Sequence, residues 1–156
     1  MKPASLNELK QELSSRPQKQ LLELCVKLAK FKKENKELLN FLLFESADLQ
    51  SYIDSIKAEI AEQFSLVNTS NLYLAKKSFR KILRYTNKYI KYTSSKQAQV
   101  ELLIHYCINL KSSGISIRKS TALTNLYNMQ LKKIYKEIGS LHEDLQYDYI
   151  KQLEAI

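Results

Sequence analysis

Residues 72–93 read LYLAKKSFRKILRYTNKYIKYT and contain neither glycine nor proline. At about 100° per residue, the apolar side chains of this stretch fall on one arc of a helix and the cations fall on the opposite arc. The apolar arc contains Leu72, Ala75, Phe79, Ile82, Leu83, Thr86, Ile90 and Thr93. The stretch therefore predicts a long amphipathic helix that packs one face against a core and exposes the other.

The rest of the chain has a composition that also favours helices. It has 156 residues but only two glycines and two prolines. Turns and strand corners normally use these residues, so their scarcity favours long helices over a β-sandwich or a barrel. The length fits one domain with a sizeable core. We expect a single all-α domain over residues 1–156, with about eight antiparallel helices in stacked hairpins, as a bundle or a short solenoid.

Residues that cap or break helices mark where the expected helices begin. In a capping box of the form S-x-x-E, the serine oxygen and the glutamate carboxylate each accept a backbone amide of the first turn. Proline is tolerated in the first turn because its missing N–H group would have no helical partner there. The expected starts are Ser5, Pro17, Asn35, Asp48, the segment 68–70, the segment 94–95, Ser120 or Thr121, and Ser140. Gly114 and Gly139 follow two of these helices, where a left-handed C-terminal cap is expected.

The expected third helix, residues 35–45, has apolar side chains on nearly all sides. They are Leu38, Leu39, Phe41, Leu42, Leu43 and Phe44. A helix that is apolar all round is typical of a buried central element. We therefore expect this helix to be the hub of the core.

Leader segments, membrane spans and cysteine spacing bear on where the protein resides. No apolar leader follows Met1, and the densest apolar run, residues 38–44, is far shorter than the ~20 residues of a membrane-spanning helix. Cys25 and Cys107 lie within apolar helical stripes, unlike the cysteine frameworks of small secreted domains. We expect a soluble cytoplasmic protein with both thiols reduced in its core and no membrane contact.

Leucine alternates with lysine, glutamate and asparagine in three segments of the first third of the chain. These segments read LNELKQEL at residues 6–13, LLEL at residues 21–24 and ELLNFLL at residues 37–43. In this patterning the chain resembles a family of uncharacterised bacterial all-helical domains. The resemblance implies a helical fold and carries over no functional residue.

The sequence contains no recognised catalytic motif. Phosphate-binding loops need several clustered glycines, and the two glycines of this chain are isolated. His105 and Cys107 are two residues apart on an expected helix, so their side chains point about 200° apart and do not form a nucleophile–base pair. We expect no catalytic residue, and an enzyme or small-molecule-binding helical bundle is a minor alternative.

Both histidines have acidic neighbours at helical spacing. Glu101 and His105 share one face, but a carboxylate-bridged metal site in a bundle needs paired Glu-x-x-His motifs and further acids. The second histidine, His142, is followed by Glu143, Asp144 and Asp148. Because such neighbours are usually i,i+4 contacts or first-turn acids that complement the helix dipole, we expect no metal site and no cofactor.

The formal net charge of +9 is concentrated in one part of the chain. Between residues 65 and 136 the only acid is Glu101. Most of the excess cations lie on the 72–93 helix, opposite its apolar arc: Lys76, Lys77, Arg80, Lys81, Arg84, Lys88 and Lys91. Like charges four residues apart repel, whereas a merely solvated helix normally mixes charges of both signs. Tyr73 lies on the cationic arc, and Tyr85 and Tyr92 flank it.

A cationic stripe about 22 Å long with aromatic neighbours suits a polyanion, whose phosphates meet the cations while its bases stack on the rings. We predict a non-catalytic binding module that engages an anionic macromolecule, nucleic acid or an acidic protein surface, through residues 76–91 and Tyr73. Arginine is scarce, so sequence-specific reading of bases is not expected. The alternative is a helical scaffold that binds a protein partner. A lysine-rich face that is simply solvated also fits the pattern.

Overall fold

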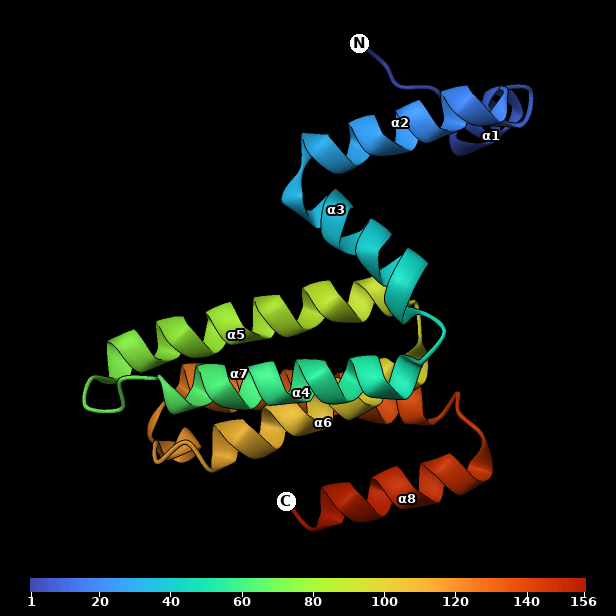
Figure 1. The fold of residues 1–156 in the computed structure, drawn as a ribbon. Coiled ribbons are helices and arrows are strands. Elements are labelled where there is room, and N and C mark those ends of the chain that lie inside the picture. The colour runs from blue at the N-terminus through green and yellow to red at the C-terminus, as the bar shows by residue number, and fades with distance from the viewer. The chain divides into compact units, whose positions relative to one another are not determined.

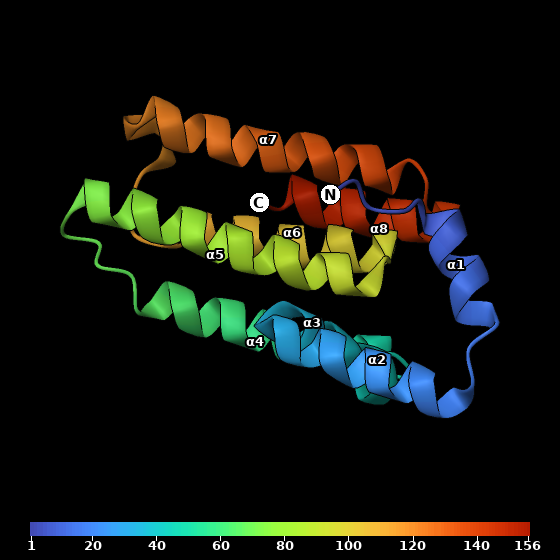
Figure 2. The same cartoon turned by 90° about the horizontal axis from the view of Figure 1, so that it is seen from above.

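The computed structural model describes all of residues 1–156 and is built from helices and short connections (Figures 1 and 2). The expected all-α class is confirmed. The chain divides into two compact units, an N-terminal unit (Met1–Phe44) and a C-terminal unit (Glu45–Ile156). The single domain expected over residues 1–156 stays a prediction.

The N-terminal unit contains three short helices. They are α1 (Leu6–Ser14), α2 (Gln18–Phe31) and α3 (Lys33–Asn40), after which the π-helical turn η1 (Phe41–Glu45) follows directly. The capping box expected at the start of α1 is confirmed, because the Glu8 amide donates to Ser5 Oγ at 3.3 Å and the Ser5 amide donates to Glu8 Oε2 at 2.7 Å. Pro17 is the residue that precedes α2 rather than the first residue of its first turn.

The expectation that residues 35–45 form the hub of the core is wrong. The segment changes from α-helix to π-helix at Phe41, and the side chains of Leu42, Leu43 and Phe44 are 54%, 63% and 76% exposed. Phe41 is its only buried residue. An apolar side chain is buried only where other elements cover it, and periodicity alone does not say which segment is covered.

The C-terminal unit is a helical bundle. Its elements are α4 (Leu49–Ser65), α5 (Leu72–Thr93), α6 (Lys96–Lys111), the 3₁₀ turn η2 (Ile117–Lys119), α7 (Thr121–Ile138) and α8 (Glu143–Glu154). Short connections make α4, α5, α6 and α7 successive antiparallel neighbours (Figure 2). Helix α6 packs against α4, α5 and α7, and α8 returns alongside α7 and α6.

Helix α6 is the true centre of the core. It buries side chains around most of its circumference: Ala98, Val100, Leu102, Leu103, Ile104, Tyr106, Cys107 and Leu110. The hydroxyl of Tyr106 donates to the Phe79 carbonyl of α5 at 2.9 Å, so this fully buried ring leaves no polar atom unpaired. The ring of Phe64 from α4 packs 5.4 Å from the Tyr106 ring. Three helices therefore meet around Tyr106.

Side-chain caps begin most helices of this bundle at the expected residues. The side chains of Asp48, Ser95 and Ser120 accept backbone amides three residues later and cap α4, α6 and α7. The cap of α5 is Asn71, whose side chain accepts the Leu74 amide at 3.1 Å, and not the segment 68–70. Asn71 lies next to the first apolar residue of the helix, which is the position a cap must have.

The glycine and serine signals near the later helices are less reliable. Gly114 has the expected left-handed conformation (φ 84°) but lies two residues beyond Ser112, the C-cap of α6. Gly139 has a right-handed conformation (φ −59°), contrary to expectation. The capping box expected at Ser140 is also absent, because α8 begins at Glu143 and its cap is His142. The Ser140 amide and hydroxyl instead both donate to the Glu137 carbonyl, and the amide bond continues α7 as a turn past its last residue.

The two cysteines lie in different environments. Cys107 is fully buried in α6, and burial raises the pKa of its thiol to about 12. Cys25 is exposed, so its expected place in the core is wrong, because α2 has no buried residue. None of the helices combines the length and apolar character that a membrane crossing requires.

Candidate functional site

The cationic arc of α5 is exposed because its opposite arc is held in the bundle. The buried side chains on α5 are Ala75, Phe79, Ile82, Leu83, Thr86, Ile90 and Tyr92. They pack against α4 and α6, which fixes the rotation of the helix. The predicted amphipathic helix is thus confirmed, with the cations directed away from the core.

We call the seven cations of this arc the cationic face: Lys76, Lys77, Arg80, Lys81, Arg84, Lys88 and Lys91. Five of them are exposed, and Lys76 and Lys88 are half-buried. Apart from Lys88, none of these side chains has a carboxylate oxygen within ion-pair distance. The helix therefore presents adjacent positive charges to solvent without neutralisation from the protein itself.

Lys88 differs from the other cations because aromatic rings surround it. Its ammonium lies 4.5 Å from the centre of the Tyr89 ring and 5.9 Å from that of Tyr85. A cation held over aromatic faces is partly stabilised by the ring quadrupole. Lys88 is thus the least available member of the cationic face for an external anion.

The three tyrosines singled out from the sequence have different environments. Tyr73 is 71% exposed at the N-terminal turn of α5. Tyr85 donates its hydroxyl to the Glu59 carboxylate of α4, and burial together with this carboxylate raises the pKa of Tyr85. Tyr92 is buried. Only Tyr73 therefore offers a ring that an external base can stack on.

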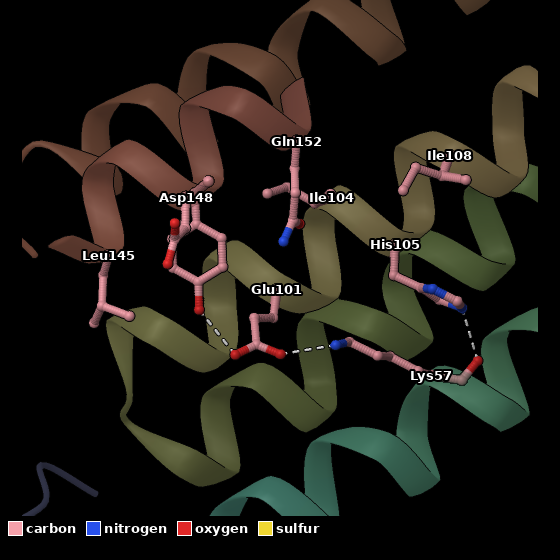
Figure 3. Close-up of a pocket in the computed structure, with 9 residues that line it drawn as sticks. Lys57, Glu101, Ile104, His105, Ile108, Leu145, Asp148 and Gln152 are labelled. Atoms are coloured by element: carbon pink, nitrogen blue, oxygen red, sulfur yellow. Dashed lines mark hydrogen bonds and ion pairs between the residues drawn. The ribbon is translucent and has the colours of Figure 1, made fainter. Parts of the chain in front are cut away.

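A second polar cluster surrounds Glu101 in a small cavity of about 260 Å³ between α4, α6 and α8 (Figure 3). Lys57 Nζ lies 2.7 Å from Glu101 Oε2. The Tyr149 hydroxyl donates to Glu101 Oε1 at 2.8 Å, and Gln97 Nε2 donates to the same oxygen at 3.1 Å. The carboxylate thus accepts from three donors on three helices.

Electrostatics hold this cluster in one protonation state near neutral pH. Burial by itself would raise the pKa of Glu101, but the hydrogen bonds from Lys57, Gln97 and Tyr149 outweigh it and the pKa lies below its ordinary value. Burial lowers the pKa of His105, and the positive charge of Lys57 lowers it further. The Lys57 carbonyl, 2.9 Å from His105 Nε2, raises this pKa but does not outweigh the other two effects. Glu101 is therefore ionised and His105 neutral at pH 7.

The residues that complete this cluster are not apparent from local sequence spacing. Glu101 and His105 are four residues apart on one face of α6, yet each is bound to α4 through Lys57 rather than to the other. Lys57 and Tyr149 are 44 and 48 residues from Glu101. One signal was present: a lone acid within a largely apolar helix, in a region otherwise rich in cations, needs a cationic partner.

The acidic cluster after His142 is spread along α8. His142 Nδ1 accepts the Asp144 amide at 3.3 Å and so caps the helix, which places Glu143 and Asp144 in the first turn. Asp148 lies one turn later and lines the Glu101 cavity. The structure contains no group of three or more His, Cys, Asp or Glu side chains arranged to hold a metal ion.

The two sites differ in the bonding capacity they leave open. Both Glu101 oxygens already accept protein donors, so this cluster joins α4, α6 and α8. The exposed cations of α5 have donors without acceptors, which makes the cationic face the stronger candidate for an external ligand. Comparisons with protein-family models, curated protein sequences and solved structures find no match to this chain.

Proposed function

We propose that this protein is a non-catalytic binding module that engages an anionic macromolecule through the cationic face of α5. One observation carries the proposal: adjacent exposed cations follow one another along the helix with no carboxylate to pair with them. Lys76, Arg80 and Arg84 follow one another at i,i+4 spacing, so their charges repel in the free protein. A bound polyanion removes this repulsion.

Nucleic acid is the polyanion that fits best. Its phosphates provide the regular negative charge that cations meet with release of counterions. Tyr73 lies on the same face and is exposed, so it offers a stacking platform for an unpaired base. Within the cationic face, only Arg80 and Arg84 have the forked guanidinium that reads guanine edges. We therefore expect binding with little sequence preference.

The direct test is fluorescence anisotropy of a labelled oligothymidine strand at several salt concentrations. If four to six phosphates are contacted, log affinity falls with log salt at a slope of about −3 to −4, since each contact on a single strand contributes about −0.7. Replacing Tyr73 with Ala is expected to weaken this binding by about 1 to 3 kcal/mol. Absence of binding at low salt contradicts the proposal for nucleic acid.

A matched pair of variants locates the binding surface. The double change Arg80→Glu and Lys81→Glu reverses two exposed charges and turns the repulsive 76/80, 77/81 and 80/84 pairs into attractive ones, so the helix stays stable. The control is Lys132→Glu with Lys133→Glu on α7, which alters the net charge equally at exposed positions. We expect loss of binding in the first variant and retention in the control. Equal loss in both would indicate a response to net charge alone.

A helical scaffold for a protein partner is the second candidate, favoured by the many exposed leucines of the N-terminal unit. A pulldown from lysate distinguishes the two candidates. Partners that disappear after nuclease treatment or at raised salt support the cationic face. A discrete protein that is retained after both treatments, and by the Arg80→Glu and Lys81→Glu variant, supports the scaffold. Polyglutamate as a competitor separates an acidic protein surface from nucleic acid.

A further inference from the structure

The N-terminal unit exposes an unusual amount of apolar surface. Helices α1, α2 and α3 contain no buried residue. The exposed large apolar side chains of α1 and α2 are Leu6, Leu9, Leu13, Leu22, Leu24, Val26, Leu28 and Phe31. A segment this short rarely supplies a core of its own, and apolar patches that span neighbouring helices mark interaction surfaces.

The apolar surface includes a groove of about 720 Å³ between α1 and α2. Leu9 and Leu13 line it from α1, and Leu24 and Leu28 line it from α2. Each pair is spaced i,i+4, so the two leucines of a pair lie on one face of their helix. An occupant that fits this groove is another amphipathic helix with leucines one turn apart. Helix α2 itself has this pattern.

The charges at the edge of the groove restrict the choice of occupant. Glu12 and Arg16 lie on the α1 side, where they form an ion pair of 3.1 Å, and Glu23 and Lys27 lie on α2. The edge therefore has equal numbers of both signs, and a partner of one sign would leave half of these charges opposite a like charge. A copy of α2 running antiparallel about a two-fold axis places each Glu23 opposite a Lys27 of the other chain.

From this complementarity we propose that the groove binds a second copy of this chain, so that the protein forms an antiparallel, two-fold symmetric dimer through α1 and α2. The leucines of each α2 then pack against the groove of the other chain, and the Glu23 and Lys27 side chains form two equivalent ion pairs at the edge. This dimer does not depend on anion binding by α5.

Light scattering coupled to size exclusion tests the dimer on the full chain. We expect the parent protein to have the mass of a dimer and to dissociate on dilution. The double change Leu24→Glu and Leu28→Glu is expected to give a monomer, with circular dichroism checking that helix content is kept. A parent protein that is monomeric at every concentration overturns the proposal and leaves the groove to another partner or to the rest of the chain.

A charge exchange tests the antiparallel geometry and excludes an effect on helix stability. Glu23→Lys alone and Lys27→Glu alone each place like charges opposite one another in a homodimer, so each variant is expected to weaken self-association. When the two variants are mixed, every inter-chain pair is again of opposite sign, although each helix keeps its altered charges. We therefore expect the mixture to form a heterodimer. If each variant dimerises as well as the parent, this edge is not the interface and the proposal is wrong.

Discussion

The two units of this chain use amphipathic helical sequences in opposite ways. In residues 45–156, α6 packs against α4, α5, α7 and α8, and nearly the whole buried core lies there. In residues 1–44, side chains of the same type are exposed or half-buried, and only Phe41 is buried. Apolar periodicity thus specifies a helix and its apolar face, whereas the burial of that face depends on having enough neighbouring elements to cover it.

The largest expected difference between the units comes from one substitution made in each. Leu103→Ala in α6 removes a side chain that is 1% exposed and is expected to lower the free energy of unfolding by about 2 to 5 kcal/mol. Leu43→Ala removes one that is 63% exposed, and we expect a loss below about 1 kcal/mol. Urea denaturation followed by circular dichroism measures both. Equal losses would mean that Leu43 is covered in solution.

A smaller effect is expected from the tie between α4, α6 and α8. Glu101→Gln keeps the shape of the side chain but removes the charge that Lys57 and Tyr149 bind, so we expect a loss of about 1 to 3 kcal/mol at pH 7. In the parent protein the pKa of Glu101 is lowered from 4.5. The contribution of the ionised carboxylate to stability is therefore complete above about pH 4.5. It is lost as the pH falls through the pKa of the folded state.

Denaturation of the parent and Glu101→Gln proteins across this pH range checks the assignment. We expect the stability difference between them to be constant at neutral pH and to shrink progressively below pH 4.5. Gln97→Ala is a useful control, because it removes one neutral donor to the same carboxylate and leaves the charge in place. A difference that does not vary with pH would show that the charge of Glu101 is not the source of the stability lost in Glu101→Gln.

Local and non-local features of the sequence were predictable to different degrees. The two arcs of α5 and the caps at Asp48, Ser95 and Ser120 depend on residues within a few positions, and the structure has them as predicted. Two partners of Glu101, Lys57 and Tyr149, lie on helices distant in sequence, so no periodicity identifies them. The core is centred on α6 and not on residues 35–45 for the same reason. An all-round apolar helix can equally be a central element or one that lacks a partner.

The smallest expected effect concerns the cationic face in the absence of any ligand. Arg80 has a cation four residues away on each side, Lys76 and Arg84, and all three lack ion pairs. Arg80→Glu converts two repulsive pairs into two attractive ones, so we expect a gain of roughly 0.5 to 1 kcal/mol in unfolding free energy at low salt. The gain should vanish in concentrated salt, which screens exposed charges.

Arg118→Glu is the control, because Arg118 lies in a short 3₁₀ turn without a cation four residues away. If Arg80→Glu makes the protein more stable and also lowers its affinity for polyanions, then the cations of this face serve binding and not folding. A change without effect in either measurement would instead identify the face as an ordinary solvated surface.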